Sequence, residues 1–163
     1  MPYWQLFYHL VWSTKYRQPL ITPDVEPIIY DLLRTKAIGL GATVFAIGGM
    51  PDHVHLVAAI PPKIAIAKFV GQIKAVASTK FNKMDHGHIL YWQDEYGAFS
   101  FDGKRLANVI IYVQRQKEHY TRQTIIPVLE RQTGESQWLL REPAPTYAIV
   151  DATWRSELLS LDD

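Results

Sequence analysis

Two histidines one residue apart are the first candidates for chemistry in this sequence. They lie in residues 51–57 (PDHVHLV), where Val54 separates His53 from His55. Side chains alternate between the two faces of a β-strand, so both imidazoles are expected on one face, where the strand begins and a ligand has access. Two such imidazoles can bind one divalent metal ion. A strand with two partly exposed polar residues has the same pattern, so spacing alone leaves both interpretations open.

A tyrosine and a glutamine one helical turn apart form the second candidate pair. Tyr112 and Gln116 are four positions apart, which places them on one face of a helix. A tyrosine hydroxyl becomes a nucleophile when a nearby cation favours the phenolate. However, a tyrosine in an apolar stretch usually packs in the core with its hydroxyl bonded at the rim, and the glutamine is usually a surface residue. Tyr112 and Gln116 therefore indicate a catalytic site only in combination with other motifs.

Residues 13–17 (STKYR) have the composition of a phosphate and base contact. Lys15 and Arg17 supply cations, the hydroxyls supply donors, and the Tyr16 ring can stack on a base. Lys68 and Lys74, in a predicted helix, have similar potential as DNA contacts. A solvated turn and a solvated helix face explain the same residues equally well.

Aromatic side chains at alternate positions mark residues 96–101 (YGAFSF). In a central strand such side chains can stack on nucleic-acid bases. The other interpretation is that Phe99 and Phe101 fill the core beneath the helices.

The hydrophobic periodicity predicts the elements that must position these residues. Strands are expected at residues 3–13, 43–47, 54–60 and 96–101, with a strand-like piece at 89–93, and helices at 24–38, 63–83 and 104–123. This order is the split βαβ arrangement of ferredoxin-like and RRM-like folds. It predicts an α+β domain with a four-stranded antiparallel sheet, helices on one face, and an extra C-terminal helix that carries Tyr112.

The composition indicates a globular protein. The chain has 163 residues, of which 48% are hydrophobic and 20% charged, and it has no cysteine. Disulfides, zinc–thiolate sites and cysteine nucleophiles are thereby excluded. No apolar run approaches the ~18 residues of a membrane span, and the start lacks the layout of a signal peptide. We expect a cytoplasmic protein without a membrane partner.

Charge is distributed unevenly along the chain. Residues 1–123 contain 14 Lys and Arg against 9 Asp and Glu, whereas residues 124–163 contain 3 against 7. The first part is therefore mildly basic, which permits a polyanionic partner, and the tail is acidic.

Four motifs in this order resemble one known family. They are residues 8–17 (YHLVWSTKYR), 50–56 (MPDHVHL), 92–100 (WQDEYGAFS) and 112–119 (YVQRQKEH). Together they make residues 3–123 similar to the single-tyrosine HUH transposases of small bacterial insertion sequences and their REP-associated relatives. The resemblance implies a catalytic domain over residues 1–123, followed by an extension, residues 124–163, of unknown role.

The resemblance also implies a reaction and its residues. His53, His55 and Gln116 correspond to the ligands of a divalent metal, Mg²⁺ or Mn²⁺, and Tyr112 corresponds to the nucleophile. Such an enzyme cleaves and rejoins single-stranded DNA through a 5′-phosphotyrosine intermediate. The implied partners are single-stranded DNA with hairpin ends and a second copy of the chain, in a homodimer with composite active sites.

Several alternatives remain open from the residues. Imidazole ligands favour zinc, manganese or nickel over magnesium. Asp52 either orients His53 or only forms the turn. Tyr120 is a second possible nucleophile. A non-catalytic RRM-like module that binds single-stranded nucleic acid, and a hydrolase that uses bound water, are the competing functions.

Overall fold

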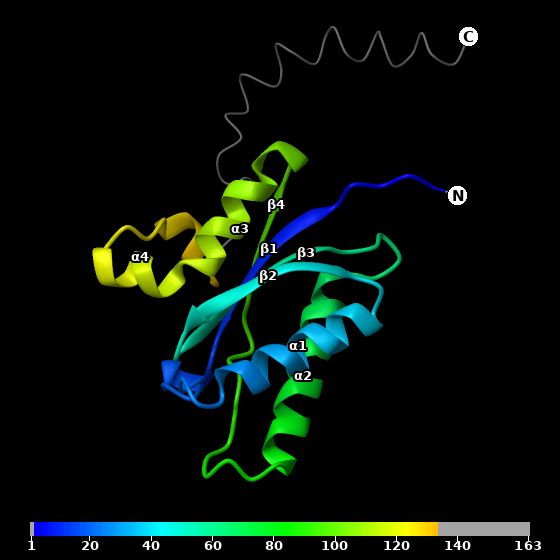
Figure 1. Cartoon of the computed structure of the whole chain (residues 1–163). Helices are drawn as coiled ribbons and strands as arrows, with labels where there is room; N and C mark the ends of the chain where they lie inside the picture. Colours follow the sequence, from blue (N-terminus) through cyan, green and yellow to red (C-terminus); the bar gives the residue numbers. More distant parts are fainter. Residues whose placement is uncertain (1, 134–163) are drawn as a thin grey trace, which may run out of the picture. The chain divides into compact units, whose positions relative to one another are not determined.

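A four-stranded antiparallel sheet with the strand order β2-β3-β1-β4 forms the centre of the fold (Figure 1). The computed structural model describes residues 2–133 of the chain. The strands are β1 (Phe7–Ser13), β2 (Thr43–Met50), β3 (His53–Ala59) and β4 (Gly97–Phe101). This is the predicted split βαβ topology, and the α+β fold class is confirmed.

Helices cover both faces of the sheet. Figure 1 shows α1 (Glu26–Gly39) and α2 (Ile66–Lys83) on one face, and α3 (Leu106–Gln114) and α4 (Gln116–Arg122) on the other. The larger core cluster lies under α1 and α2, and a smaller one, which includes Val57 and Val113, lies under α3. The extra helix that carries Tyr112 therefore packs on the face opposite to the two crossover helices.

The two central strands are buried on both faces, and their alternation sorts apolar from polar side chains. Leu10 of β1 and Leu56 of β3 belong to the core under α1 and α2. The intervening positions, His9, His53 and His55, carry imidazoles instead, and their rings contact one another and the aromatic rings of α3 and α4. One face of the sheet is thus an ordinary hydrocarbon core, whereas the other carries a cluster of histidines.

Three sequence-based boundaries are wrong. The single helix expected over residues 104–123 is two helices, separated at Arg115, whose φ and ψ are −103° and 25°. Residues 89–93 form only an isolated bridge between Thr14 and Trp92. Strand β2 continues to Met50 and β3 begins at His53, so the turn between them is shorter than the gap between the strands expected at residues 43–47 and 54–60.

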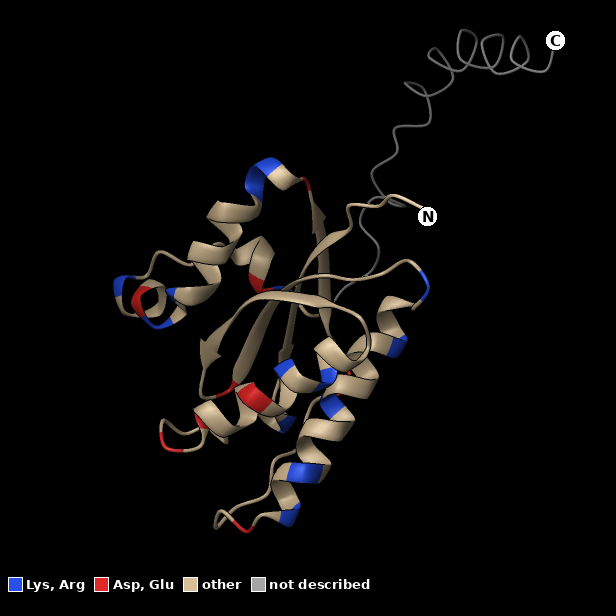
Figure 2. Cartoon of the chain, turned by 45° about the vertical axis from the view of Figure 1, so that its right-hand side comes forward, with Lys and Arg blue, Asp and Glu red and all other residues tan. Residues whose placement is uncertain are grey.

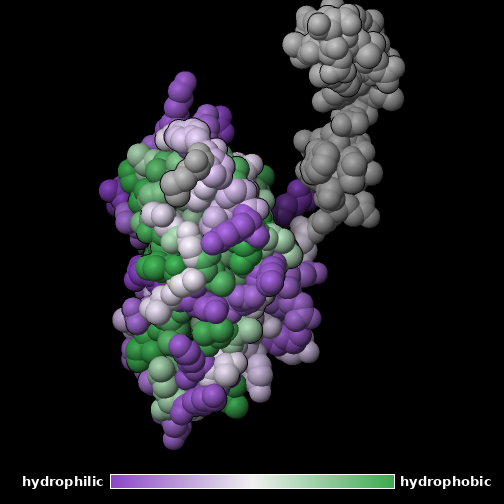
Figure 3. Space-filling model, turned by 90° about the vertical axis from the view of Figure 1, so that its right-hand side faces the viewer, coloured by the Kyte–Doolittle hydropathy of each residue, from purple (hydrophilic) through white to green (hydrophobic). Residues whose placement is uncertain are grey.

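The surface mixes charged, polar and apolar residues. Figure 2 shows Lys and Arg spaced along α2, and Figure 3 shows hydrophobic and hydrophilic groups interspersed on the side that it presents. Within residues 2–133, no helix combines the length and the hydropathy that crossing a bilayer would require.

Candidate active site

The two histidines of residues 51–57 lie side by side on β3, and both are fully buried. Their ring centroids are 5.1 Å apart, so they share one face of the strand as the spacing predicts. The expectation that this face is open to a ligand is wrong in this structure. Gln116, Tyr120 and Glu130, which come from α4 and the segment after it, contact the rings of His53 and His55.

His53 has a partner on each ring nitrogen. Its Nδ1 lies 2.7 Å from Oδ1 of Asp52, and its Nε2 lies 3.4 Å from Oε1 of Gln116. Asp52 is also paired with Arg17, at 3.2 Å. Burial acts to raise the pKa of Asp52, but the hydrogen bond and charge of His53 and the charge of Arg17 outweigh it and lower the pKa. The carboxylate therefore fixes the ring orientation of His53, as considered from the sequence.

His55 contacts two residues, His9 and Glu130, that sequence analysis did not associate with it. Its Nδ1 lies 2.7 Å from Nε2 of His9 on β1, and its Nε2 lies 2.9 Å from Oε2 of Glu130. Burial lowers the pKa of His55, and burial together with His55 lowers the pKa of His9 to about 3. His9 is therefore a neutral imidazole at physiological pH.

The hydroxyl of Tyr112 points into the same cluster. It donates a hydrogen bond to Oε1 of Glu130 and accepts one of 3.1 Å from the backbone N–H of Ile126. The side chain is almost entirely buried. Burial, reinforced by the Glu130 hydrogen bond, raises the pKa of Tyr112 to about 12. In this arrangement the phenol is therefore held protonated.

A glycine allows α3 to approach the sheet closely enough for this contact. A Cβ added to Gly48 of β2 would lie 1.9 Å from the carbonyl oxygen of Val113. Because Gly48 is the register partner of His55, the backbone of α3 lies directly over the histidine cluster. Any side chain at this position would lift Tyr112 and Gln116 away from the histidines.

Glu130 is the site residue that sequence analysis missed. It lies in the 3₁₀ turn η3 (Pro127–Glu130), within the tail whose role was unknown. Its two carboxylate oxygens contact Tyr112 and His55, and Oε2 also lies 3.5 Å from Nε2 of His53. Burial tends to raise its pKa, but the His55 hydrogen bond and the neighbouring charges lower it to about 2. A lone glutamate far from every motif carries no local signal that would have identified it.

These side chains form a donor set that suits a divalent metal. One ligand atom each from His53, His55 and Glu130 lies within 4.8 Å of the others, and Gln116 Oε1 faces His53. Two imidazoles with carboxylate and amide oxygens are ligands that Mn²⁺ accepts readily, and the two oxygens also suit Mg²⁺. The residues present therefore fit the metal that the resemblance implies.

The predicted DNA contacts of the first motif lie beside the site. Tyr16 is 79% exposed, Arg17 is exposed and Lys15 is half-buried, with its Nζ 5.4 Å from the centroid of the Tyr16 ring. Tyr16 and Arg17 both have positive φ, a conformation that non-glycine residues rarely adopt. Through Arg17 and Asp52 this turn is connected to His53.

The two lysines of α2 differ from each other. Lys68 is exposed, as a DNA contact requires. Lys74 is only 8% exposed, and its Nζ donates hydrogen bonds to the backbone oxygens of Gln93 (2.6 Å) and Glu95 (3.4 Å). The prediction of Lys74 as a surface contact does not match this placement, because its ammonium group anchors the strand-like segment before β4 instead.

The aromatic residues of β4 face the histidine cluster. Phe99 lies 5.8 Å from the His9 ring and Phe101 stacks on Phe7 at 5.9 Å. Phe101 packs against the cluster under α3, which agrees with the interpretation that it fills the core beneath a helix.

Comparison with known proteins identifies the family. The family model described as "Transposase IS200 like" matches residues 2–116, which is most of the described chain. The chain belongs to the IS200-like transposase family. The ISDra2 transposase TnpA of Deinococcus radiodurans is 29% identical over 123 residues, covering 71% of this chain and 86% of the relative. The transposase of insertion sequence IS200 from Salmonella typhimurium is 24% identical over 121 residues, covering 71% and 79%.

Two solved structures share the fold of this IS200-like transposase. A Deinococcus radiodurans R1 protein assigned as a transposase superposes with a TM-score of 0.57 at 27% identity, covering 71% of this chain and 95% of that one. A REP-associated tyrosine transposase bound to a REP hairpin gives a TM-score of 0.50 at 14% identity, covering 77% and 76%. The family resemblance drawn from the four motifs is thus confirmed. The family match ends at Gln116, so Glu130 lies beyond it.

Proposed function

We propose that this IS200-like transposase cleaves and rejoins single-stranded DNA through a 5′-phosphotyrosine on Tyr112. The supporting observation is the position of the Glu130 carboxylate. One of its oxygens accepts from the Tyr112 hydroxyl, and the other lies on His55 Nε2, 2.9 Å away. A tetrahedral phosphate presents oxygens in a similar way, so the carboxylate marks where an anion fits between a nucleophile and the histidine pair.

His53, His55 and Gln116 are the proposed ligands of a divalent ion, Mg²⁺ or Mn²⁺. When bound, the ion supplies Lewis-acid stabilisation of charge on the phosphate. Asp52 orients His53, since it accepts the Nδ1 proton and leaves the lone pair of Nε2 directed toward Gln116 and Glu130, the other proposed donors. Glu130 belongs to the same donor set in this structure, and we propose that the DNA phosphate takes its place.

The chemistry assigned to Tyr112 is a single displacement at phosphorus. The phenol oxygen forms a bond to phosphorus while the bond to the 3′ oxygen breaks, and the strand leaves with a free 3′ hydroxyl. The phenol proton passes to solvent, and the leaving oxygen takes up a proton. Because one phosphodiester replaces another, rejoining needs no external energy source.

Access of DNA requires residues 126–131 to move. The Ile126 N–H and the Glu130 carboxylate both hold the Tyr112 hydroxyl, and Gln116 and both histidines are buried. A phosphate cannot reach the phenol oxygen while these bonds persist. We refer to residues 126–131 as the strap and infer that the structure represents the closed form of the enzyme.

The nucleophile is tested by trapping the covalent intermediate. The protein is incubated with Mn²⁺ and labelled single strands from the DNA that flanks its gene, and protein–DNA adducts are measured on denaturing gels. We expect an adduct that Tyr112→Phe abolishes. Tyr120→Phe is the matched control, because Tyr120 lies 3.4 Å from the same carboxylate and its pKa is also raised, to about 12, chiefly by burial. An adduct that survives Tyr112→Phe but not Tyr120→Phe would reassign the nucleophile.

The subunit arrangement is tested by mixing two inactive variants, Tyr112→Phe and His53→Gln. The resemblance implies a homodimer with composite sites, whereas in this structure Tyr112 and the histidines of the same chain lie together. Restored adduct formation in the mixture would support composite sites, and its absence would support sites within one chain.

The REP hairpin bound by the REP-associated relative supports hairpin-ended DNA as the partner.

The proposed DNA contacts outside the reaction centre are Lys15, Tyr16, Arg17 and Lys68. The proposed catalytic domain comprises residues 1–123.

A non-catalytic binding module is not favoured, because binding alone does not require a tyrosine, two histidines and a glutamine to converge beneath two helices. A water-using hydrolase would leave no adduct in the trapping experiment.

A further inference from the structure

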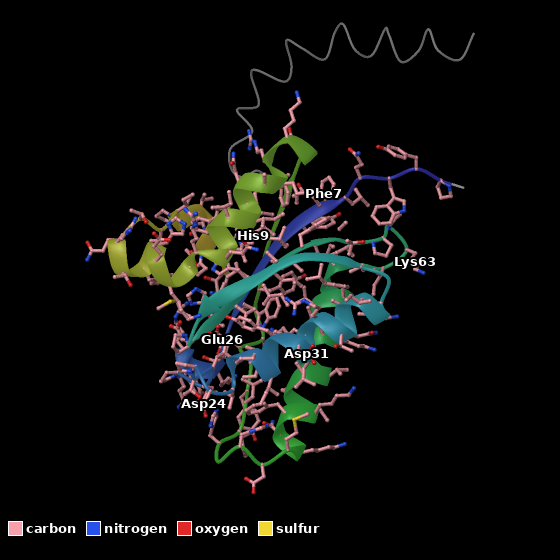
Figure 4. The ribbon with its side chains drawn as sticks, viewed as in Figure 1. Phe7, His9, Asp24, Glu26, Asp31 and Lys63 are labelled. Carbon is pink, nitrogen blue, oxygen red and sulfur yellow. The ribbon has the colours of Figure 1, made fainter. Side chains whose placement is uncertain are left out.

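A third histidine in the buried cluster has no part in the chemistry described so far. His9 lies on β1 beneath α3 and is 1% exposed (Figure 4). Its ring centroid is 4.9 Å from that of His55, 5.8 Å from Phe99 and 6.2 Å from Tyr112. A polar ring that is buried so completely among aromatic side chains incurs a cost that an apolar residue would avoid.

The single polar contact of His9 within residues 2–133 is with His55. Nε2 of His9 lies 2.7 Å from Nδ1 of His55, whereas Nδ1 of His9 has no hydrogen-bond partner among the described residues. At 2.7 Å the two facing nitrogens form a hydrogen bond, so one proton lies between them. The position of that proton decides which tautomer His55 adopts.

The tautomer of His55 determines what its Nε2 can do. When the proton is on His9, His55 carries its own proton on Nε2 and donates it to Glu130, which matches the observed 2.9 Å contact. When the proton is on His55 Nδ1, His55 has given up its Nε2 proton and His9 carries its own proton on Nδ1, so that both rings stay neutral and the lone pair of His55 Nε2 is free for a metal. That second tautomer needs an acceptor for the Nδ1 proton, and His9 Nε2 is in position to accept it.

The parallel with the other histidine supports this assignment. A metal-binding histidine almost always donates its second ring N–H to a neighbouring acceptor, which fixes the ring and its tautomer. His53 has Asp52 at 2.7 Å from Nδ1, and His55 has His9 at the same distance. Each of the two proposed histidine ligands therefore has its own supporting residue on the side away from Glu130.

We propose that His9 is the positioning residue of His55: it accepts the Nδ1 proton of that ring and so holds Nε2 as a metal ligand. The inference rests on the proposed function, in which His55 binds the metal. It gives a role to His9, the histidine of the first motif (residues 8–17), for which the family resemblance implied none.

The test compares Mn²⁺ affinity, measured by isothermal titration calorimetry, between the wild type and two variants. His9→Phe keeps a ring of similar size beside Phe99 but removes both nitrogens, and we expect about 10- to 100-fold weaker Mn²⁺ binding. His9→Gln places an amide near the position of Nε2, so it should recover part of that loss. His86→Phe is the matched control, because this ring stacks on Phe81 in the other core. Unchanged affinity in His9→Phe, or equal losses in the Phe and Gln variants, would overturn the proposal.

A second measurement separates this proposal from the metal site itself. Imidazole ¹⁵N NMR of the metal-free full-length protein identifies the tautomer of each histidine. In the wild type we expect His55 to be protonated on Nε2, and in His9→Phe we expect a mixture of its tautomers or ring orientations. An identical His55 pattern in both proteins would refute the role of His9. A wild type that binds no Mn²⁺ but shows the expected NMR change would instead refute the metal and leave His9 as the residue that orients His55.

Discussion

Among single residues, Glu130 has the largest influence on the site, because its carboxylate contacts both the proposed nucleophile and a proposed metal ligand. Glu130 contacts the hydroxyl of Tyr112 and the ring of His55. With burial, this contact raises the pKa of Tyr112 to about 12, which opposes formation of the phenolate that attack requires. The carboxylate therefore stabilises the observed arrangement and disfavours ionisation of Tyr112, the nucleophile that we propose.

Replacing Glu130 by Gln tests this role. The substitution keeps the size of the side chain but removes the negative charge that disfavours the phenolate and that, in the proposed mechanism, competes with the DNA phosphate. We expect adduct formation with single-stranded DNA to become several-fold faster, roughly the effect of lowering a nucleophile's pKa by one unit, while Mn²⁺ binding without DNA weakens. Glu118→Gln on α4 is the control. Loss of both the adduct and Mn²⁺ binding in Glu130→Gln would show that the carboxylate is a permanent ligand instead.

At the scale of elements, two glycines let the backbone come close to the sheet on the histidine side. Gly48 admits α3 against β2, and Gly97 of β4 admits the strap, since a Cβ there would lie 1.9 Å from the carbonyl oxygen of Arg131. β4 is held by its ladder to β1, whereas the strap lies on the sheet as a 3₁₀ turn. The same Cβ would lie 2.8 Å from Cγ1 of Val11 on β1, but the conflict with the backbone of Arg131 is more severe, so we expect the strap to be displaced first.

Gly97→Ala is expected to open the strap. Displacing Arg131 moves the neighbouring Glu130 and breaks the hydrogen bond from the Ile126 N–H to Tyr112. Hydrogen exchange of the Ile126 amide should become about tenfold faster, equivalent to roughly 1.4 kcal/mol of lost protection. Gly71→Ala is the matched control, because no atom lies within 4 Å of an added Cβ there. Unchanged exchange at Ile126 with a large fall in Tm would mean that the sheet yields before the strap.

At the scale of the whole molecule, one buried cation links α2 to the segment that leads into β4. Burial lowers the pKa of Lys74 to about 8, while its ammonium group donates to the backbone oxygens of Gln93 and Glu95. In the unfolded chain the pKa returns to ~10.4. Between these two values the unfolded state binds more protons, so the contribution of Lys74 to the free energy of unfolding rises with pH.

Lys74→Met should remove this pH dependence. We expect the wild type to gain up to about 3 kcal/mol of unfolding free energy from this residue between about pH 8 and 10.5, a gain that the variant lacks. Urea unfolding at pH 7.5 and pH 10 measures both proteins, and the difference between their pH slopes isolates Lys74. Equal slopes would show that the ammonium group is better solvated than its burial indicates.

Features that depend on local periodicity and local motifs could be predicted from the sequence. The alternation of β1 and β3 fixes which side chains share a face, so the pairing of His53 with His55 followed from their spacing. The helical spacing of Tyr112 and Gln116 held as well, although a break at Arg115 separates their helices. Neither proline nor glycine lies at that break, so no local signal could place it.

The groups that meet at the histidines from distant parts of the chain could not be predicted from the sequence. His9 is 46 residues from His55 and Glu130 is 75 residues from it, yet both contact its ring. Strand order brings β1 beside β3, and the path of the chain after α4 brings η3 over them. Such contacts depend on packing between segments far apart in sequence, whereas periodicity reports only which face a side chain occupies. Lys74 is buried for the same reason: the segment before β4 packs against it, and its position among the lysines of α2 did not indicate this.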